Sequence, residues 1–351
     1  MDAHDAFITN SLSVFLIDGS GIMKDEFEFI ASITPHKTGQ SSLVKGIGDD
    51  AAVYRGSEQY EEVICVDTMV EGVHFRRDTL TPYQIGKKVL AVNVSDLAAM
   101  GAIPTYYLVS VAASADWNQE ELQQVYEGMS ELAGTYGMDL IGGDTVSTPD
   151  TLVLTVTVIG RVERNRALYR DTARPGDIVF LTGCAGLSAA GLDLLFEKGL
   201  NGVFSEDEKQ LVRAHQEPLP HVKQGRILSR IGARVALNDV SDGVASEANE
   251  IAEASGVKIH IDEMSIPIDK AMLHYSRKKQ LNYTFFGGED FILIGTIGEE
   301  DFKIVKEAYM EQELTITKIG HVLEGEGVYL QEEGKLTKLE KKGYNHFQKR
   351  G

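Results

Sequence analysis

The sequence predicts an α/β protein, with mixed α+β sheets, that folds as two domains. The chain has 351 residues, which exceeds the usual size of a single domain. From about residue 63 to residue 293, β-rich apolar runs alternate with segments of helical periodicity. A charged stretch near 162–176, ERNRALYRDTARPGD, interrupts this alternation and is typical of a linker. We therefore expect domains at 24–163 and 164–351, preceded by an extension at 1–23.

The first 22 residues read as an upstream extension with little fixed structure. The short apolar stretch at 10–17 follows acidic residues and no Lys or Arg, which makes it a poor signal peptide. Met23 opens the segment MKDEFEFI and looks like a natural start. Because no secretory signal is present, Cys65 and Cys184 are expected to be reduced thiols of a cytoplasmic protein.

Composition narrows the class of partner. The formal net charge of −19 argues against nucleic acid, whose phosphate backbone is bound by basic surfaces. A nucleotide remains compatible with this charge if metal ions neutralise its phosphates. No apolar run approaches the roughly 18 residues that span a bilayer, so no membrane partner is expected.

The first strand and helix of the alternation carry two carboxylates. The apolar run 63–66 predicts a strand that ends at Asp67, and Thr81-Pro82 predicts the start of a helix. In that helix Ile85, Val89, Val92 and Asp96 recur at spacings of four, three and four, which places Asp96 on the inward stripe. A buried carboxylate requires a cation or a donor, and a metal ion is favoured over a buried salt bridge.

The remaining elements of the first half follow in the same alternation. Strands are predicted at 106–112, 138–141 and 152–159, with the GGD motif at the end of the second of these. Asn118 and Glu121 form a capping-box pattern for a helix with a core stripe at Leu122, Val125, Met129, Leu132 and Tyr136. Tyr126 lies beside that stripe and is suited to flank a ligand, although a lone tyrosine is more often a packing residue.

The second half begins another αβ block. A strand at 178–182 precedes TGCAGLSAAGL, a glycine turn that lacks the lysine and hydroxyl of a phosphate-binding P-loop. A strand at 235–237 leads through NDVSDG into a helix with Val244, Ala248, Ile251 and Ala252 inward, and 286–293 carries GGED.

Five short aspartate-bearing segments stand out along this alternation. They read GIGDDAAV, VDTMVEGVHF, NVSDLAAMGA, LIGGDT and NDVSDG. A single Asp in a turn means little, because Asp caps helices and fills turns everywhere. Carboxylates repeated beside glycine turns and strand ends are what a protein needs to hold Mg²⁺ against a polyphosphate, since Mg²⁺ prefers carboxylate and phosphate oxygens.

These segments, in this order and spacing, resemble the thiamine-monophosphate kinases of the ATP-binding superfamily that includes aminoimidazole ribonucleotide synthetase. Further matching blocks are ARPGD, EIAEASGV, GGEDF and KGYNHF, so the resemblance runs from about residue 27 to residue 347. It implies a two-domain aminoimidazole ribonucleotide synthetase-like fold whose N-terminal sheets pair in a homodimer. It also implies ATP-dependent phosphorylation of thiamine monophosphate to thiamine diphosphate, the last step of thiamine diphosphate biosynthesis.

The resemblance assigns roles to particular positions. Carboxylates would hold several Mg²⁺ ions against ATP, with two backbone carbonyls added: Asp50, Cys65, Val66, Asp67, Asp96, Asp144, Asp239 and Asp242. Contacts to ATP would come from Tyr126, Gly143, Asp144, Arg170 and Ser241. Contacts to thiamine monophosphate would come from His74, Glu289 and Tyr344. The nucleophile is a substrate phosphate oxygen that is already ionised near pH 7, so the resemblance implies no general base.

The chain departs from the family pattern at three places. Two arginines of an R-P-x-P-R stretch are replaced in Glu217-Pro218-Leu219-Pro220-His221, which weakens any phosphate contact there. Ile292 stands where Glu is usual, and Val146-Ser147 replaces a threonine-arginine pair. None of these departures removes an expected metal ligand.

Ordinary roles remain open for several candidate residues. His74 is also compatible with a surface histidine, Tyr344 with an anchor for the tail, Arg170 with half of a surface ion pair and Glu289 with a turn residue. Two other function classes also remain open. One is a ligase-like enzyme that uses ATP to activate a carbonyl or amide oxygen, which turnover assays with candidate substrates would separate. The other is a nucleotide-binding maturation protein, whose relatives carry a reactive C-terminal cysteine, whereas the last cysteine here is Cys184.

Overall fold

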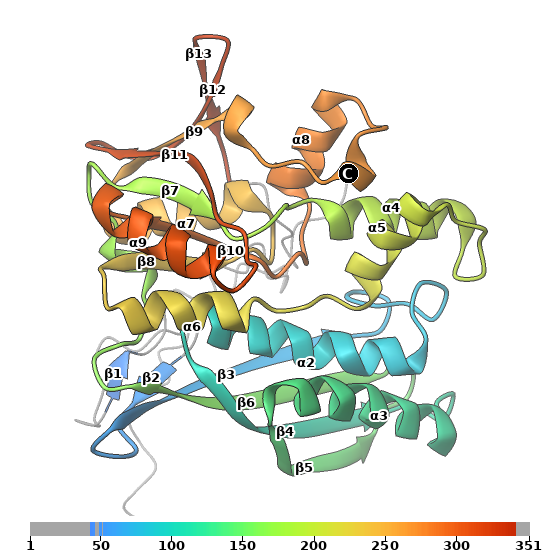
Figure 1. Ribbon diagram of the computed structural model, residues 1–351. Helices are drawn as coiled ribbons and strands as arrows, with labels where there is room; N and C mark the ends of the chain where they lie inside the picture. The colour runs from blue at the N-terminus through green and yellow to red at the C-terminus, as the bar shows by residue number, and fades with distance from the viewer. Residues whose placement is uncertain (1–42, 46–48, 51, 342–351) are drawn as a thin grey trace, which may run out of the picture. The chain divides into compact units, whose positions relative to one another are not determined.

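The computed structural model describes residues 43–45, 49–50 and 52–341. The expected extension at 1–23 and Tyr344 lie outside these residues. The described residues lie in one compact unit that contains two mixed sheets with helices packed on them, which confirms the predicted α/β class (Figure 1). None of the helices in the described part of the chain has the length and apolarity that crossing a membrane requires.

The first sheet has six strands in the order β1-β2-β3-β6-β4-β5. All neighbours are antiparallel except β4 and β5, which are parallel. Its strands are β1 (Leu43–Lys45), β2 (Ala52–Tyr54), β3 (Tyr60–Val70), β4 (Ile103–Ala113), β5 (Asp139–Ser147) and β6 (Val153–Glu163). Two helices, α2 (Pro82–Ala99) and α3 (Gln119–Tyr136), lie over one face of this sheet (Figure 1).

Two strands extend further than the sequence predicts. Asp67 was expected at the end of a strand, but β3 continues to Val70 because it pairs with β6 along its whole length. The GGD motif was also expected after a strand, yet Asp144 lies within β5, which pairs with β4 up to Ser147. Cross-strand pairing therefore carries both strands through residues that propensity alone assigns to turns.

The second sheet has seven strands in the order β13-β12-β9-β11-β7-β10-β8, with only β9 and β12 parallel. Its strands are β7 (Ile178–Leu181), β8 (Val235–Asp239), β9 (Lys258–Asp262), β10 (Leu293–Ile297), β11 (Thr317–Leu323), β12 (Gly327–Glu332) and β13 (Lys335–Leu339). The α-helices of this half are α4 (Leu187–Lys198), α5 (Glu206–Gln216), α6 (Val222–Ile231), α7 (Val244–Ser255), α8 (Arg277–Phe286) and α9 (Glu299–Met310). Short 3₁₀ turns are η1 (Arg170–Thr172), η2 (Glu263–Ser265) and η3 (Lys270–Met272).

Helix α2 begins where the sequence predicts and becomes the centre of the fold. Thr81 forms a capping box with Gln84, and Pro82 occupies the first turn. The helix contacts α3, β3 and β6 on one side and α6 and β8 on the other. It is therefore buried around most of its circumference, including the polar side chains Lys88, Asn93 and Ser95.

Glycines allow the helices around α2 to approach closely. A Cβ on Gly86 of α2 would lie 1.8 Å from the Val125 carbonyl oxygen of α3. A Cβ on Gly225 of α6 would lie 2.1 Å from the Ala98 carbonyl oxygen of α2. Because real Cβ atoms do not approach so closely, these positions exclude every other residue while α2 keeps its place.

Candidate functional site

Three aspartates from distant segments meet where α2 passes between the two sheets. Asp50 precedes β2, Asp96 lies on α2, and Asp239 ends β8. One carboxylate oxygen from each lies within 4.8 Å of the others, and we call this group the aspartate cluster. The hydroxyl of Ser95 donates to Asp239 Oδ2 at 2.6 Å and so ties α2 to the second sheet at this point.

Burial and mutual repulsion disfavour the ionised forms of the three carboxyl groups in the aspartate cluster. Removal from water, followed by repulsion from neighbouring aspartates, raises the pKa of Asp96 well above its usual range. Burial likewise raises the pKa of Asp50, against the Arg170 charge that lowers it. The pKa of Asp239 rises to about 7, mainly because of burial. A cation among these oxygens would reverse this cost by favouring the ionised forms.

Asp67 adds a fourth carboxylate beside Asp96. It lies on the α2-facing side of β3, and a hydrogen bond with Asp96 partly offsets the burial that raises its pKa. Asp67 Oδ2 and Asp50 Oδ2 are both buried without a hydrogen-bond partner among the described residues. Hard oxygen donors, crowded together and incompletely hydrogen-bonded, fit a divalent cation such as Mg²⁺.

The backbone N–H and C=O groups of Cys65 and of Val66 point to opposite sides of β3. The Asp67 N–H donates to Asn93 Oδ1 at 3.0 Å and therefore points away from β6. Because directions alternate along a strand, Cys65 shares this direction while the Val66 backbone faces β6. The Cys65 thiol is buried and donates to the Asn93 carbonyl oxygen at 3.3 Å. Of the two expected carbonyl ligands, Cys65 thus has its carbonyl on the side away from β6.

Arg170 of η1 lies in a network of carboxylates behind the aspartate cluster. Its guanidinium contacts Asp50, and it lies 2.6 Å from Glu250 Oε2 and 3.5 Å from Asp49 Oδ1. The charged stretch expected as a linker therefore supplies a residue of the site. Arg170 is largely buried, so the alternative of a surface ion pair is wrong.

Glu247 of α7 was not identified from the sequence, yet it supports the NDVSDG loop. Its carboxylate accepts from the Asp242 N–H at 3.0 Å, from the Ser241 hydroxyl at 3.3 Å and from Asn238 Nδ2 at 2.6 Å. The signal for it was present, because Glu247 and Glu250 follow this loop at one-turn spacing in the next helix.

Gly143 and Asp144 lie on β5, at the other edge of the first sheet from β1. A Cβ on Gly143 would lie 2.0 Å from the Val109 carbonyl oxygen, so only glycine permits this pairing with β4. Asp144 is exposed and does not belong to the aspartate cluster. Asp242 also lies outside that cluster, although Glu247 links its backbone to the same network.

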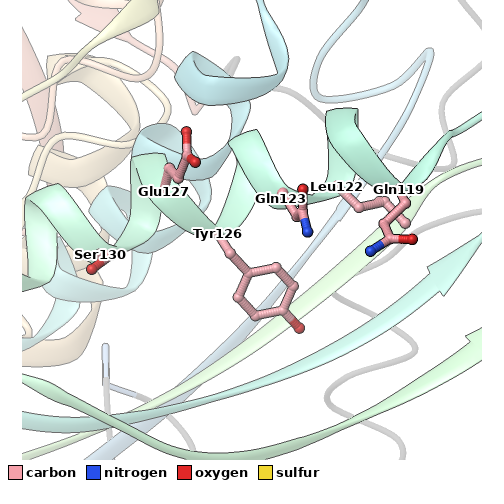
Figure 2. Close-up of a pocket in the computed structure, with 6 residues that line it drawn as sticks. All are labelled: Gln119, Leu122, Gln123, Tyr126, Glu127 and Ser130. Atoms are coloured by element: carbon pink, nitrogen blue, oxygen red, sulfur yellow. The ribbon is translucent and has the colours of Figure 1, made fainter.

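Tyr126 lines a groove along α3. The groove has a volume of about 870 Å³ and is lined by Gln119, Leu122, Gln123, Tyr126, Glu127 and Ser130. Figure 2 shows the Tyr126 ring extending from the helix towards the strands. The ring also packs against the apolar core, so the packing role and a ligand role are compatible.

The expected substrate residues His74 and Glu289 both have ordered side chains. His74 Nδ1 accepts from the Val70 N–H at 3.0 Å, which places the proton of the neutral imidazole on Nε2. Glu289 has a φ of +67°, its N–H donates to the Ser241 carbonyl oxygen at 2.7 Å, and its carboxylate pairs with Lys88. These contacts fix both the backbone and the carboxylate of Glu289 within its turn.

The segment Glu217–His221, which departs from the family pattern, lacks the two arginines expected there, and its side chains make contacts within the protein. Glu217 Oε2 accepts from Lys87 Nζ at 2.8 Å. His221 Nδ1 lies 2.7 Å from the Thr182 hydroxyl, and burial lowers its pKa to about 4, so this histidine is neutral. The segment therefore supplies no cation of its own.

The chain matches two models of one protein family in sequence order. Residues 48–162 match AIR synthase related protein, N-terminal domain, and residues 174–333 match AIR synthase related protein, C-terminal domain. Thiamine-monophosphate kinase of Bacillus subtilis (strain 168) is 51% identical over 327 residues, which make up 92% of this chain and 99% of the relative. The kinase of the same name from Escherichia coli (strain K12) is 34% identical over 325 residues, 92% of this chain and 98% of the relative.

A solved structure resembles the fold over a similar span. The structure of AaThiL complexed with AMPPCP and TMP has a TM-score of 0.79 and 32% sequence identity, and the match covers 92% of this chain and 97% of that chain. Sequence and structural likeness therefore both extend over nearly the whole chain.

Proposed function

Because the chain belongs to the AIR synthase related family, and within it to the thiamine-monophosphate kinases, we propose that it transfers the terminal phosphate of ATP to thiamine monophosphate. The products are thiamine diphosphate and ADP. The observation that carries this function is the 51% identity to a thiamine-monophosphate kinase along nearly its whole length, on a chain that gathers carboxylates at one site. The AaThiL structure holds AMPPCP, an ATP analogue, together with TMP, which fits the same pair of substrates.

The carboxylates serve to bring two anionic substrates together. The aspartate cluster and Asp67 fit Mg²⁺, as their crowded and incompletely hydrogen-bonded oxygens indicate. We extend this ligand set to Asp144, Asp242 and the Cys65 carbonyl, and we leave out the Val66 carbonyl because it is directed at β6. When bound, Mg²⁺ supplies positive charge to the phosphate oxygens during the in-line transfer.

The remaining residues bind and orient the two substrates. We assign Tyr126, Gly143, Asp144, Arg170 and Ser241 to ATP. We assign His74, Glu289 and Tyr344 to thiamine monophosphate. In His74 the Val70 N–H holds the ring through Nδ1, and Glu289 offers carboxylate oxygens. The attacking phosphate oxygen is ionised near pH 7, so no side chain is needed to remove a proton from it.

A second copy of the chain is the expected partner, and the open face of the first sheet supports a homodimer. This face points away from α2 and α3, and Val66 and Tyr106 on it are 58% and 44% exposed. Apolar side chains on a sheet face that none of the described helices covers favour association. A monodisperse monomer at micromolar concentration in analytical ultracentrifugation would exclude this partner, and Val66→Lys should weaken a dimer that forms.

We also retain a division into domains at 24–163 and 164–351 and a cytoplasmic location. The division into domains is supported by the two family models, which match residues 48–162 and 174–333. Both cysteines, Cys65 and Cys184, are free thiols, as expected for a reducing compartment.

A direct assay tests the proposed function. The protein is incubated with ATP, Mg²⁺ and either thiamine monophosphate or thiamine, and the products are separated by chromatography. We expect equal amounts of ADP and thiamine diphosphate with thiamine monophosphate, and neither product with thiamine. Absence of thiamine diphosphate at millimolar substrate would overturn the proposal, and ADP formation only with a carboxylate or amide substrate would favour a ligase-like activity.

A further inference from the structure

Lys88 on α2 is a fully buried lysine that the roles assigned above leave unused. Its side chain has an exposed fraction of 0%, and its Nζ donates to Glu289 Oε2 at 2.8 Å. An ammonium group removed from water in this way is strongly unfavourable unless a carboxylate compensates it. Glu289, which we assign to the substrate, is that carboxylate.

His215 of α5 completes the environment of the Lys88 ammonium. His215 Nε2 lies 3.4 Å from Lys88 Nζ, and its Nδ1 lies 3.1 Å from the Ser188 hydroxyl. Burial and then the Lys88 charge lower the pKa of His215 to about 2, so the ring is neutral. Because an ammonium can only donate, Nε2 must accept from Lys88 and the proton must sit on Nδ1.

In this tautomer the Nδ1–H faces the Ser188 hydroxyl, and the same side of the ring borders Glu289. His215 Nδ1 lies 3.5 Å from Glu289 Oε2, the same oxygen that accepts from Lys88. Both neighbours therefore face one oxygen of the carboxylate. Within the described part of the chain no hydrogen bond reaches Oε1, and the Glu289 side chain remains 30% exposed.

The backbone of the GGED turn is fixed as firmly as the side chain. The Glu289 N–H donates to the Ser241 carbonyl oxygen, and a Cβ on Gly288 would lie 2.5 Å from that oxygen. On the other side, the Asp290 carboxylate accepts from the backbone N–H groups of Gly186 and Ser188 at 2.5 and 3.0 Å. The turn is thus held between the NDVSDG loop and the start of α4.

We propose that Lys88, together with His215, is a positioning residue that holds the Glu289 carboxylate through Oε2 and presents its Oε1 to the substrate. The proposal rests on the assignment of Glu289 to thiamine monophosphate. Because the Lys88 charge already balances the carboxylate, Glu289 recognises a hydrogen-bond donor of the substrate, such as its amino group, more than a positive charge.

A double-mutant cycle tests whether Lys88 acts through Glu289. We compare wild type, Lys88→Met, Glu289→Gln and the double variant by steady-state kinetics and by calorimetric binding of thiamine monophosphate in the presence of a non-hydrolysable ATP analogue. We expect each single variant to raise KM and Kd for thiamine monophosphate about tenfold, a loss of about 1.4 kcal/mol, with KM for ATP changed less than about twofold. The double variant should be no worse than Glu289→Gln.

Lys87→Met is the matched control, because Lys87 is the neighbouring lysine of α2 and pairs with Glu131 and Glu217 instead. It should leave KM for thiamine monophosphate unchanged. If Lys88→Met does not fold, the double variant still decides, since it leaves no buried charge without a partner. A double variant clearly weaker than Glu289→Gln, or equal loss of both substrates, overturns the proposal.

The outcomes also separate this inference from the proposed function. Turnover of thiamine monophosphate by wild type with additive effects in the cycle would overturn the positioning role alone. Wild type that binds thiamine monophosphate without turnover would overturn the kinase function, while calorimetry would still report the cycle. Wild type that neither binds nor phosphorylates this substrate would overturn both.

Discussion

Asp96→Asn should stabilise the metal-free protein while it abolishes activity. Two ionised carboxylates 4.8 Å apart, the limit of separation in the aspartate cluster, repel each other by about 3 kcal/mol at an effective dielectric constant near 20. Asp96 takes part in two such pairs, and partial protonation, which its raised pKa favours, reduces the repulsion that is present. We expect a net gain of about 2 kcal/mol in the free energy of unfolding.

The assay is thermal unfolding in EDTA and in millimolar Mg²⁺, together with turnover. With an unfolding entropy of about 2.1 cal/mol/K per residue, 351 residues convert this gain into a rise in Tm of about 3 °C in EDTA. The variant should also show a smaller Tm increase with Mg²⁺ than wild type, and at least about a tenfold lower kcat.

Asp150→Asn is the matched control, because it makes the same isosteric change at an exposed turn residue. Its Tm in EDTA and its response to Mg²⁺ should equal those of wild type. The reasoning would be refuted if Asp96→Asn had a Tm below that of wild type in EDTA, or if Mg²⁺ raised its Tm as much as that of wild type. The first result would mean that the aspartates do not repel one another appreciably in the absence of a cation, and the second that Asp96 does not bind the cation.

Three other substitutions test separate parts of the structure. Asp67→Asn should lower turnover by at least about tenfold without lowering Tm, because it removes a hard ligand; turnover above a tenth of wild type would exclude that role. The pKa of His221 is about 4 in the folded chain and near 6.5 in the unfolded chain, so protons bind preferentially to the unfolded state as pH falls. Between about pH 7.5 and about pH 5.5 the free energy of unfolding, measured by urea denaturation, should therefore fall by about 1.4 kcal/mol more in wild type than in His221→Asn. Equal losses would mean that His221 is not buried as a neutral ring. Gly86→Ala should lower the free energy of unfolding by about 3 kcal/mol or more, because its Cβ would meet the α3 backbone. Gly134→Ala, which has open space around it, should not destabilise the protein. Similar free energies of unfolding for the two variants would argue against the close helix contact.

Local signals predicted α2 well and the strands less well. The Thr81-Pro82 start and the placement of Asp96 on the inward stripe are confirmed, because capping and helical periodicity depend on residues close in sequence. The extents of β3 and β5 were wrong, because they are determined by pairing with β6 and β4, which a local pattern does not contain.

The candidate site was likewise predicted only as far as local sequence patterns allow. The segments that carry the aspartates were evident from their composition, but which aspartates meet depends on the packing of α2 between two sheets. Lys88 was overlooked although it lies three residues after Ile85 and four before Val92, on the stripe that identified Asp96. A lysine at such a position is normally taken as exposed, so its burial was apparent only once Glu289, about 200 residues later, was placed beside it.

The glycine contacts of α2 also determine which parts of the molecule are able to move. With Gly86 against α3 and Gly225 packed on its other side, α2 has no space in which to slide or rotate. Ligands therefore act on the segments that face this helix, above all the loop that carries Ser241 and the turn that carries Glu289, whose hydrogen bonds a bound substrate would stabilise further. In hydrogen exchange, the α2 amides should be among the slowest in the chain, and substrate binding should alter protection chiefly in those two segments. The helix thus acts as a stationary frame against which the reacting groups are aligned.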